Sequence, residues 1–161
     1  MTSALRGRQA VGDEIAGRLI RRHSTAVVLL HRAVADALGL GPTDHKCLDI
    51  LRERGPMTGS DLAGITGLTT GAITGVVARL EAAGFIGRIP DPSDGRRQTL
   101  SVMPERMRDV EEVFAPLRAE AEAALAEFDV TELAAIHTFL QVMTDCIHRQ
   151  VALMRARTLT S

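Results

Sequence analysis

Residues 67–84 read GLTTGAITGVVARLEAAG, and this stretch decides the fold. Its apolar residues recur at spacings of three, one and three, which predicts a helix with one buried face. Those residues are Ile73, Val76, Val77 and Leu80. Thr69 or Thr70 is expected to cap the start of the helix, and Gly84 is expected to end it in the left-handed conformation.

Two shorter helices are predicted before this one, and glycines separate all three. Pro42 stops the preceding segment, and Thr43 is expected to cap a helix that runs to about Arg54. Thr58 and Asp61 have the spacing of a capping box, which predicts a short helix that ends at the glycine turn. Three short helices joined in this way resemble a helix-turn-helix unit.

After Gly84 the pattern changes from helical to extended. Residues 85–89 and 98–102 each predict a short strand, and turn-forming residues lie between them. The result is a hairpin whose polar tip carries Arg96 and Arg97, with Asp94 placed to pair with one of them. The other interpretation of this tip is a solvated turn with a local ion pair.

Long helices are predicted on both sides of this central region. They cover residues 13–38, residues 104–128 and residues 129–155, and the last opens on a box-like pair, Asp129 and Glu132. Their apolar stripes are too broad for a central region of about sixty residues to cover. A homodimer is the simplest closed arrangement that buries the remainder.

The composition excludes several classes of protein. A chain of 161 residues with 45% hydrophobic and 24% charged residues predicts one globular core rather than disorder. No run of eighteen apolar residues is present, so no membrane association is expected. The N-terminus lacks a secretory signal, and two cysteines are too few for a disulfide framework, which together indicate the cytoplasm.

No motif for catalysis or metal binding is present. The sequence contains no phosphate loop, nucleophile elbow or metalloprotease motif, and the histidines lie on separate predicted helices without metal-ligand spacing. We therefore expect no enzyme activity, no catalytic residues, no metal and no cofactor.

The charges are distributed unevenly. Residues 1–42 carry a net +3, residues 43–101 are neutral, and residues 102–161 carry −4. Arginine supplies 18 of the 19 basic residues. Its fixed fork suits phosphate and guanine, although coding from GC-rich DNA also enriches it.

Three stretches together resemble the MarR family of dimeric winged-helix transcription regulators. They are LGLGPTDH at 38–45, the stretch at 67–84 and DPSDGRR at 91–97. The resemblance implies a mainly α fold with a small β hairpin, as a single regulator domain over residues 1–161. Within it, a winged helix-turn-helix DNA-binding lobe covers about 43–102. The N- and C-terminal helices, at about 13–39 and 103–155, form the dimerisation region.

The resemblance also implies how the protein meets double-stranded DNA. The helix at about 70–83 enters the major groove and the wing enters the adjacent minor groove, so a dimer reads a pseudo-palindrome. Small residues let the backbone approach, and hydroxyls meet phosphates or base edges. The expected DNA-binding residues are Ser60, Thr69, Thr70, Gly71, Thr74, Gly75, Arg79, Asp94, Arg96 and Arg97. For Arg79 the alternatives are a phosphate contact and a surface ion pair.

Members of the family commonly respond to small aromatic acids, so the function implied is a ligand-responsive repressor. The expected effector pocket comprises His23, Val27, His31, Cys47 and Leu51, with a histidine donating to the carboxylate of the effector. The competing interpretation places His23 and His31 in the dimer interface. Both cysteines are interpreted as buried small hydrophobic residues, and His45 as solvated or interfacial.

Two other function classes remain open from the sequence. The first is a winged-helix protein-interaction module that has lost specific DNA binding, which the neutral central region and the single arginine of the reading helix favour. The arginine pair of the hairpin argues against it, because a protein-binding module has no need to display that pair. The second is an enzyme or a small-molecule carrier whose ligand binding is indifferent to DNA.

Overall fold

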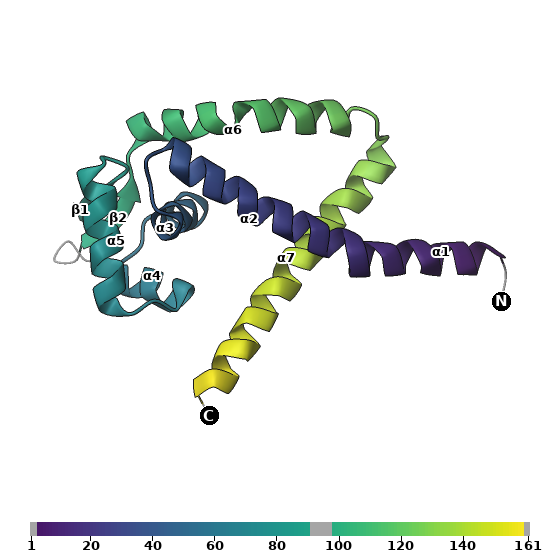
Figure 1. Ribbon diagram of the computed structural model, residues 1–161, viewed down its shortest axis with the longest axis horizontal. Coiled ribbons are helices and arrows are strands. Elements are labelled where there is room, and N and C mark those ends of the chain that lie inside the picture. Colours follow the sequence, from purple (N-terminus) through teal and green to yellow (C-terminus); the bar gives the residue numbers. More distant parts are fainter. Residues whose placement is uncertain (1–2, 91–97, 160–161) are drawn as a thin grey trace. The chain divides into compact units, whose positions relative to one another are not determined.

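The computed structural model describes residues 3–90 and 98–159, which are mainly helical with one antiparallel hairpin (Figure 1). This confirms the predicted fold class. The elements in chain order are α1 (Ser3–Glu14), the π-helical segment η1 (Ile15–Leu19), α2 (Ile20–Ala37), α3 (Pro42–Arg54), α4 (Gly59–Thr66), α5 (Thr70–Ala82), β1 (Ile86–Pro90), β2 (Gln98–Val102), α6 (Pro104–Leu125) and α7 (Val130–Leu159). The described residues up to Phe114 form one compact unit, and those from Ala115 onward form another.

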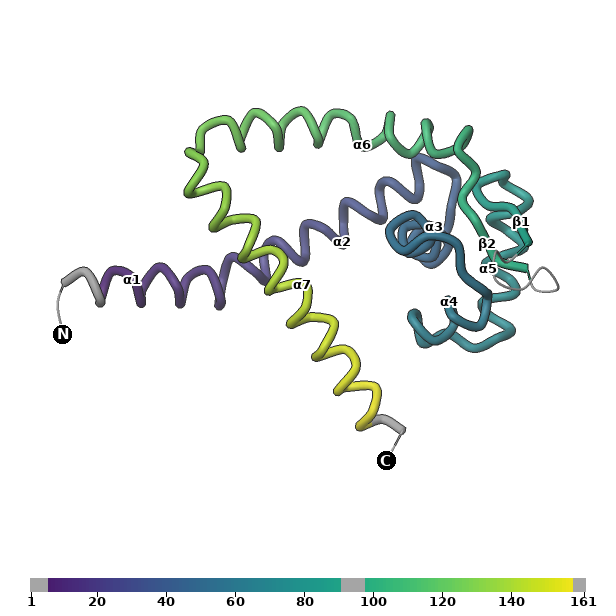
Figure 2. Tube along the Cα trace, turned by 180° about the vertical axis from the view of Figure 1, so that it is seen from behind, coloured from purple at the N-terminus to yellow at the C-terminus, as the bar shows by residue number. Residues whose placement is uncertain are grey.

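The core of the first unit lies among α3, α4, α5 and the hairpin (Figure 2). Large, fully buried apolar side chains come from α3 (Leu48, Leu51), α4 (Leu62) and α5 (Val76, Leu80), and from Phe85, which directly precedes β1. Strand β1 pairs with β2 in a register that sets Ile86 opposite Val102. Met57 adds a bridge to Leu100, which fastens the start of α4 to the hairpin.

The predicted capping boxes are both present. The Thr58 hydroxyl accepts the Asp61 N–H at 3.2 Å, and the Asp61 carboxylate accepts the Thr58 N–H at 3.0 Å. At the start of α7, the Asp129 carboxylate accepts the Glu132 N–H and the Glu132 carboxylate accepts the Asp129 N–H, both at 2.9 Å. Each box satisfies donors that the first turn of a helix leaves without intrahelical partners.

The end of α5 is a Schellman motif around Gly84, as the sequence predicts. Gly84 has φ +74°, and its N–H donates to the Glu81 carbonyl at 2.9 Å. The N–H of Phe85 donates to the Leu80 carbonyl at 3.0 Å. Phe85 is fully buried, so the motif turns the chain into the core and then into β1. For the same reason β1 begins at Ile86, one residue later than expected.

Several predicted helix boundaries are wrong. The first helical stretch begins at Ser3 rather than Asp13, and the π-helical segment interrupts it. Helix α3 begins at Pro42 with extended Gly41 before it, so Thr43 is not its cap. Proline suits this first position because it lacks the N–H that a helix start leaves unpaired. Helix α6 ends at Leu125, before residue 128, and α7 continues to Leu159, past Arg155.

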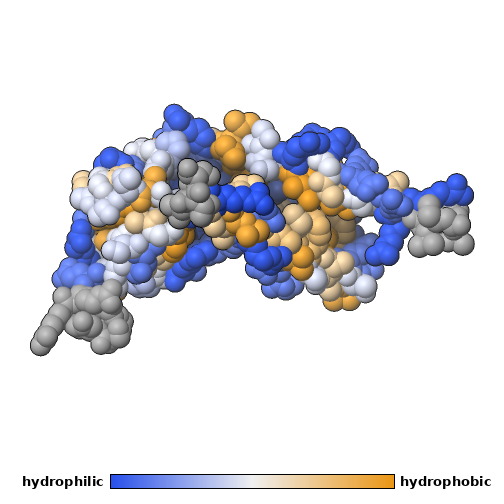
Figure 3. All heavy atoms as spheres, turned by 90° about the horizontal axis from the view of Figure 1, so that it is seen from below, coloured by the Kyte–Doolittle hydropathy of each residue, from blue (hydrophilic) through white to orange (hydrophobic). Residues whose placement is uncertain are grey.

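Large apolar side chains are exposed on both units, and apolar patches are visible on the face drawn in Figure 3. They include Val28 and Leu29 of α2 and Leu140, Ile147 and Met154 of α7. Among the described residues, no single helix is long and apolar enough to cross a membrane. Helices α4 and α5 meet the length and composition criteria together, with a bend of 115° between them.

Replacing Thr58 by alanine should cost about 1 kcal/mol of stability, because the Asp61 N–H loses its acceptor. The measurement is the urea unfolding midpoint by circular dichroism. Ser60→Ala is the matched control: Ser60 is exposed in the same first turn and should unfold with the wild-type midpoint. Equal midpoints for all three proteins would show that the box contributes nothing.

Candidate nucleic-acid interface

Helices α4 and α5 form the helix-turn-helix, joined through Gly67, whose φ is +75°. The Thr69 hydroxyl caps α5 by accepting the Ala72 N–H at 3.2 Å, as predicted. All four residues of the predicted apolar face are buried in the core: Ile73, Val76, Val77 and Leu80. The first turn of α5 and the face of the helix opposite the buried one are therefore the surfaces available to a partner.

The exposed face of α5 consists of small and polar residues. Thr70, Gly71 and Thr74 are exposed, and a side chain at Gly71 would meet nothing within 4 Å. The Thr74 hydroxyl donates to the Thr70 carbonyl at 2.9 Å, which leaves its oxygen as an acceptor. Thr69 uses its oxygen as an acceptor in the cap and keeps its O–H as a donor. The turn thus offers a hydroxyl donor, a hydroxyl acceptor and a surface without bulk.

Arg79 forms a bidentate ion pair with Asp44 of α3. Its Nε donates to Asp44 Oδ2 at 2.8 Å, and its Nη2 donates to Oδ1 at 2.7 Å. The Asp44 side chain is only 5% exposed and the Arg79 side chain 59%. Of the two interpretations of Arg79, the structure shows the ion pair. A Cβ at Gly75 would lie 3.3 Å from Arg79 Nη1, so the glycine leaves room for the guanidinium.

Other basic residues of the lobe are also paired with carboxylates. The pairs are Lys46 with Asp49, Arg52 with Glu111, and Arg88 with Glu81. A cation that already has a carboxylate partner offers less net charge to a phosphate. Asp94, Arg96 and Arg97, the predicted wing residues, lie outside the described residues. Ser60 is exposed in the first turn of α4, near the start of the helix-turn-helix.

The five residues of the expected effector pocket differ in exposure. His23 is exposed, Val27 and His31 are half-buried on α2, and Cys47 and Leu51 are buried in the core. A hollow of about 280 Å³ touches Cys47, and its lining includes none of the other four expected residues. It is lined by Pro42, Thr43, Lys46, Cys47, Thr66 and Leu68.

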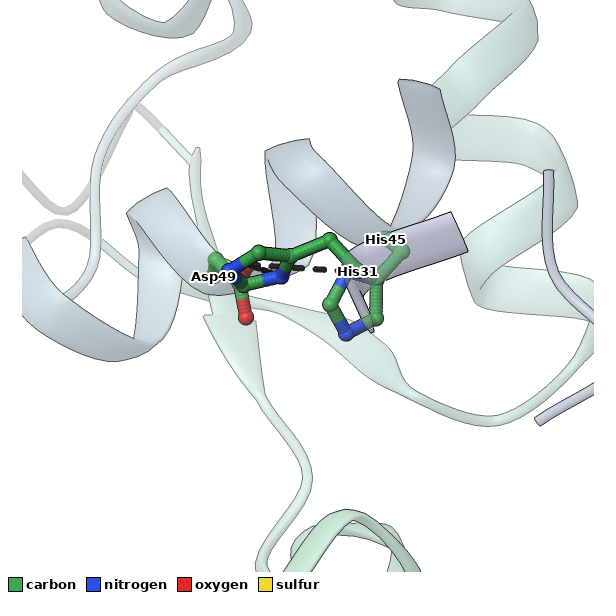
Figure 4. A group of neighbouring side chains, drawn as sticks. All are labelled: His31, His45 and Asp49. Carbon is green, nitrogen blue, oxygen red and sulfur yellow. Dashed lines mark ion pairs between the residues drawn. The ribbon is translucent and has the colours of Figure 1, made fainter. Parts of the chain in front are cut away.

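His31 instead lies against His45 and Asp49 of α3 (Figure 4). His45 is 1% exposed, so the expectation that it is solvated or interfacial is wrong. Burial is the main cause that lowers the pKa of both imidazoles, and the Lys46 cation adds to it. Spacing along the sequence does not predict this group, because its members come from two helices that meet only in the fold.

The two cysteines differ. Cys47 is buried, as expected, and burial together with the Asp44 carboxylate raises the pKa of its thiol to about 11. Such a thiol is a poor nucleophile near neutral pH. The expectation is wrong for Cys146, which is only half-buried and accepts a hydrogen bond from Arg149 Nη2 at 3.0 Å.

Comparison with known proteins agrees with this arrangement. Residues 40–97 match the MarR family. The chain is 38% identical over 139 residues to YcgE, an uncharacterized HTH-type transcriptional regulator of Bacillus subtilis (strain 168), covering 86% of this chain and 90% of the relative. The chain belongs to the MarR family.

Two solved structures have a similar fold. A MarR family protein from Bacillus stearothermophilus superposes with a TM-score of 0.66 at 19% identity, covering 87% of this chain and 96% of that one. Bordetella bronchiseptica BpsR, whose DNA binding is regulated by 6-hydroxynicotinic acid, superposes with a TM-score of 0.50 at 25% identity, covering 83% and 95%.

Membership of the MarR family settles the class of function. The protein is a DNA-binding transcription regulator with a winged helix-turn-helix, and the expectation that it is not an enzyme is confirmed. Asp44 is the residue at this interface that the sequence analysis missed. An acid in the first turn of a helix is common, and only the fold shows that Arg79 reaches it.

Replacing Arg79 by alanine should lower the urea midpoint, because it leaves the buried Asp44 carboxylate without its partner. Asp44→Asn in the same chain should restore part of the loss, so the double variant should lose less than the sum of the single variants. Arg54→Ala, at an exposed arginine that ends α3, is the control and should stay within about 0.5 kcal/mol of wild type. Strictly additive losses would contradict a coupled pair.

Proposed function

We propose that this MarR-family protein is a homodimeric repressor that binds a pseudo-palindromic operator and is released by a small aromatic acid. The observation that carries the proposal is the first turn of α5, where a polar surface of small residues is exposed while the apolar face is fully buried. A helix N-terminus of this kind presents hydroxyls and the positive end of the helix dipole to DNA.

In this proposal the first turn of α5 enters the major groove. Gly71 and Gly75 allow the backbone to approach the bases, and Thr70 and Thr74 bring hydroxyls and methyl groups to their edges. Thr69 and Ser60 contact phosphates. Because these side chains are short, they make few base-specific hydrogen bonds, and part of the specificity comes from DNA shape.

In this proposal the wing contributes more electrostatic attraction to DNA than α5 does. Arg79 is already engaged with Asp44, so Arg96 or Arg97 is the better candidate to enter a minor groove, with Asp94 orienting the guanidinium. Binding should therefore be sensitive to salt mainly through the wing.

A second copy of the chain completes the regulator. Exposed apolar side chains on α2 and α7 support this part of the proposal, since a monomer gains nothing by leaving Val28, Leu29, Leu140 and Ile147 in water. A two-fold dimer presents two α5 helices to half-sites about one helical turn apart. Such a repressor acts in the cytoplasm, where the operator is accessible.

The test is binding to a labelled duplex from the upstream region of the protein's own gene, titrated over salt. Wild type should bind this duplex well above random DNA. Arg96→Ala should bind more weakly, with the slope of log affinity against log salt shallower by about one, because one phosphate contact is lost. Arg54→Ala, a charge-matched control at the end of α3, should keep the wild-type slope.

If wild type prefers no duplex, including fragments tiled across the flanking region, the repressor proposal is wrong. The protein-interaction module is then the better explanation, and the paired cations of the lobe favour it. An Arg96→Ala variant that keeps the wild-type affinity and slope would remove Arg96 from the proposal and leave Arg97 as the contact from the wing.

The effector part of the proposal is supported by the regulation of BpsR by 6-hydroxynicotinic acid, a heteroaromatic acid. The probes are 6-hydroxynicotinic acid and hydroxybenzoic acids. Their effect on operator binding is measured in buffer that contains a metal chelator. An effector that weakens operator binding must itself bind more weakly to the protein–DNA complex, by the same factor. His31→Ala should abolish the release, whereas His137→Ala, at an exposed histidine of α7, should not. Ligand binding that is indifferent to DNA would indicate a carrier instead.

A further inference from the structure

Three potential metal ligands converge where α2 packs on α3 (Figure 4). His31 comes from α2, and His45 and Asp49 occupy successive turns of one face of α3. One ligand atom from each residue lies within 4.8 Å of the other two. The cluster lies entirely within the first compact unit.

Two of the three distances between ligand atoms match those around a tetrahedral cation. Asp49 Oδ2 lies 3.3 Å from His31 Nδ1 and 3.5 Å from His45 Nδ1. A Zn²⁺ ion bound at about 2.0–2.1 Å holds neighbouring ligand atoms about 3.3 Å apart. The carboxylate is therefore already placed to share an ion with either imidazole, and the two imidazole nitrogens, within 4.8 Å of each other, would have to close to a similar distance.

The polar atoms of the cluster are not satisfied by one another. The His45 side chain is 1% exposed, and its Nδ1 lies 3.5 Å from the Asp49 carboxylate, while its Nε2, on the other side of the ring, has no hydrogen-bond partner. Nδ1 of His31 is also buried without a hydrogen bond, although the Asp49 oxygen is close, because the geometry of that contact is unsuitable. Buried polar atoms are rarely left unpaired, so the unpaired Nδ1 of His31 beside a carboxylate indicates a further ligand.

The surroundings keep both rings competent to coordinate. The Phe114 ring lies 6.2 Å from the His31 ring and 6.4 Å from the His45 ring, centre to centre, and shields one side of the cluster. Burial lowers the pKa of each imidazole, which favours the neutral form that binds metals.

Lys46 is the group that opposes a cation here. Its Nζ lies 3.3 Å from the same Asp49 oxygen, and its side chain is 55% exposed. The ammonium therefore occupies the place of a counter-ion when no metal is bound, and the exposed side chain is free to move into solvent. Because the ammonium competes with a cation for Asp49, removing its charge should strengthen metal binding, whereas removing a ligand should weaken it.

We propose that His31, His45 and Asp49 bind one divalent transition-metal cation of the Zn²⁺ type, with an open fourth position. Two imidazoles and one carboxylate are a ligand set that such ions use in proteins. The bound ion would link α2 to α3. The inference does not rest on repression or on an operator, because metal binding is measured without DNA.

The experiment uses the full chain, stripped of metal with a chelator that is then removed. Zn²⁺ is titrated in competition with a chromophoric chelator, and Co²⁺ is added separately to record the visible absorption of a tetrahedral site. We expect one ion per chain. His31→Gln and Asp49→Asn should weaken Zn²⁺ binding on the order of 100-fold and abolish the Co²⁺ bands.

Lys46→Gln should tighten Zn²⁺ binding by about tenfold, because the competing ammonium is gone. His23→Gln on α2 and His148→Gln on α7 are the controls and should leave affinity unchanged. Circular dichroism confirms that each variant is folded, and the buried His45 is left intact because its loss endangers the core. The proposal is overturned if wild type takes up no Zn²⁺, or if uptake survives His31→Gln and Asp49→Asn.

Discussion

The whole interface depends on how completely α5 buries one of its faces. Four aliphatic side chains of this helix are buried away from water in a core shared with α3, α4 and the hairpin. Burial on this scale contributes roughly 1.5–3 kcal/mol for each large side chain, which is far more than any surface contact in the lobe. The rotation of the helix is thereby fixed, and the small polar residues have only one direction in which to point.

Electrostatics in the lobe follow from that packing. Asp44 is buried at the start of α3, and a buried carboxylate requires a partner. Arg79, the arginine of α5, meets that requirement, so its guanidinium is engaged in holding α5 to α3. The neutral charge balance of the region is thus reflected in its contacts, with cations and carboxylates matched in pairs.

Local signals in the sequence predict the helices and strands well. They do not predict which residues of different elements contact one another. Capping boxes at Thr58 and Asp129 and the glycine at position 84 depend on neighbours within four residues, so their spacing reveals them. The start of α3 is missed because a proline after glycine removes the need for a threonine cap. The partnership of Arg79 with Asp44 joins residues 35 positions apart. The same holds for the histidine cluster, since only tertiary packing brings α2 to α3.

Gly75 limits how the recognition surface can evolve. Positions 70, 71 and 74 are exposed, and a side chain at 71 would meet nothing within 4 Å, so the fold tolerates changes there. A Cβ at position 75 would lie 3.3 Å from Nη1 of Arg79, so the guanidinium would have to shift slightly to accommodate it. In the proposed complex with DNA, a change of operator preference is therefore open through these three neighbouring positions. The fourth position, Gly75, lies against the Arg79 guanidinium as well as at the proposed approach to DNA.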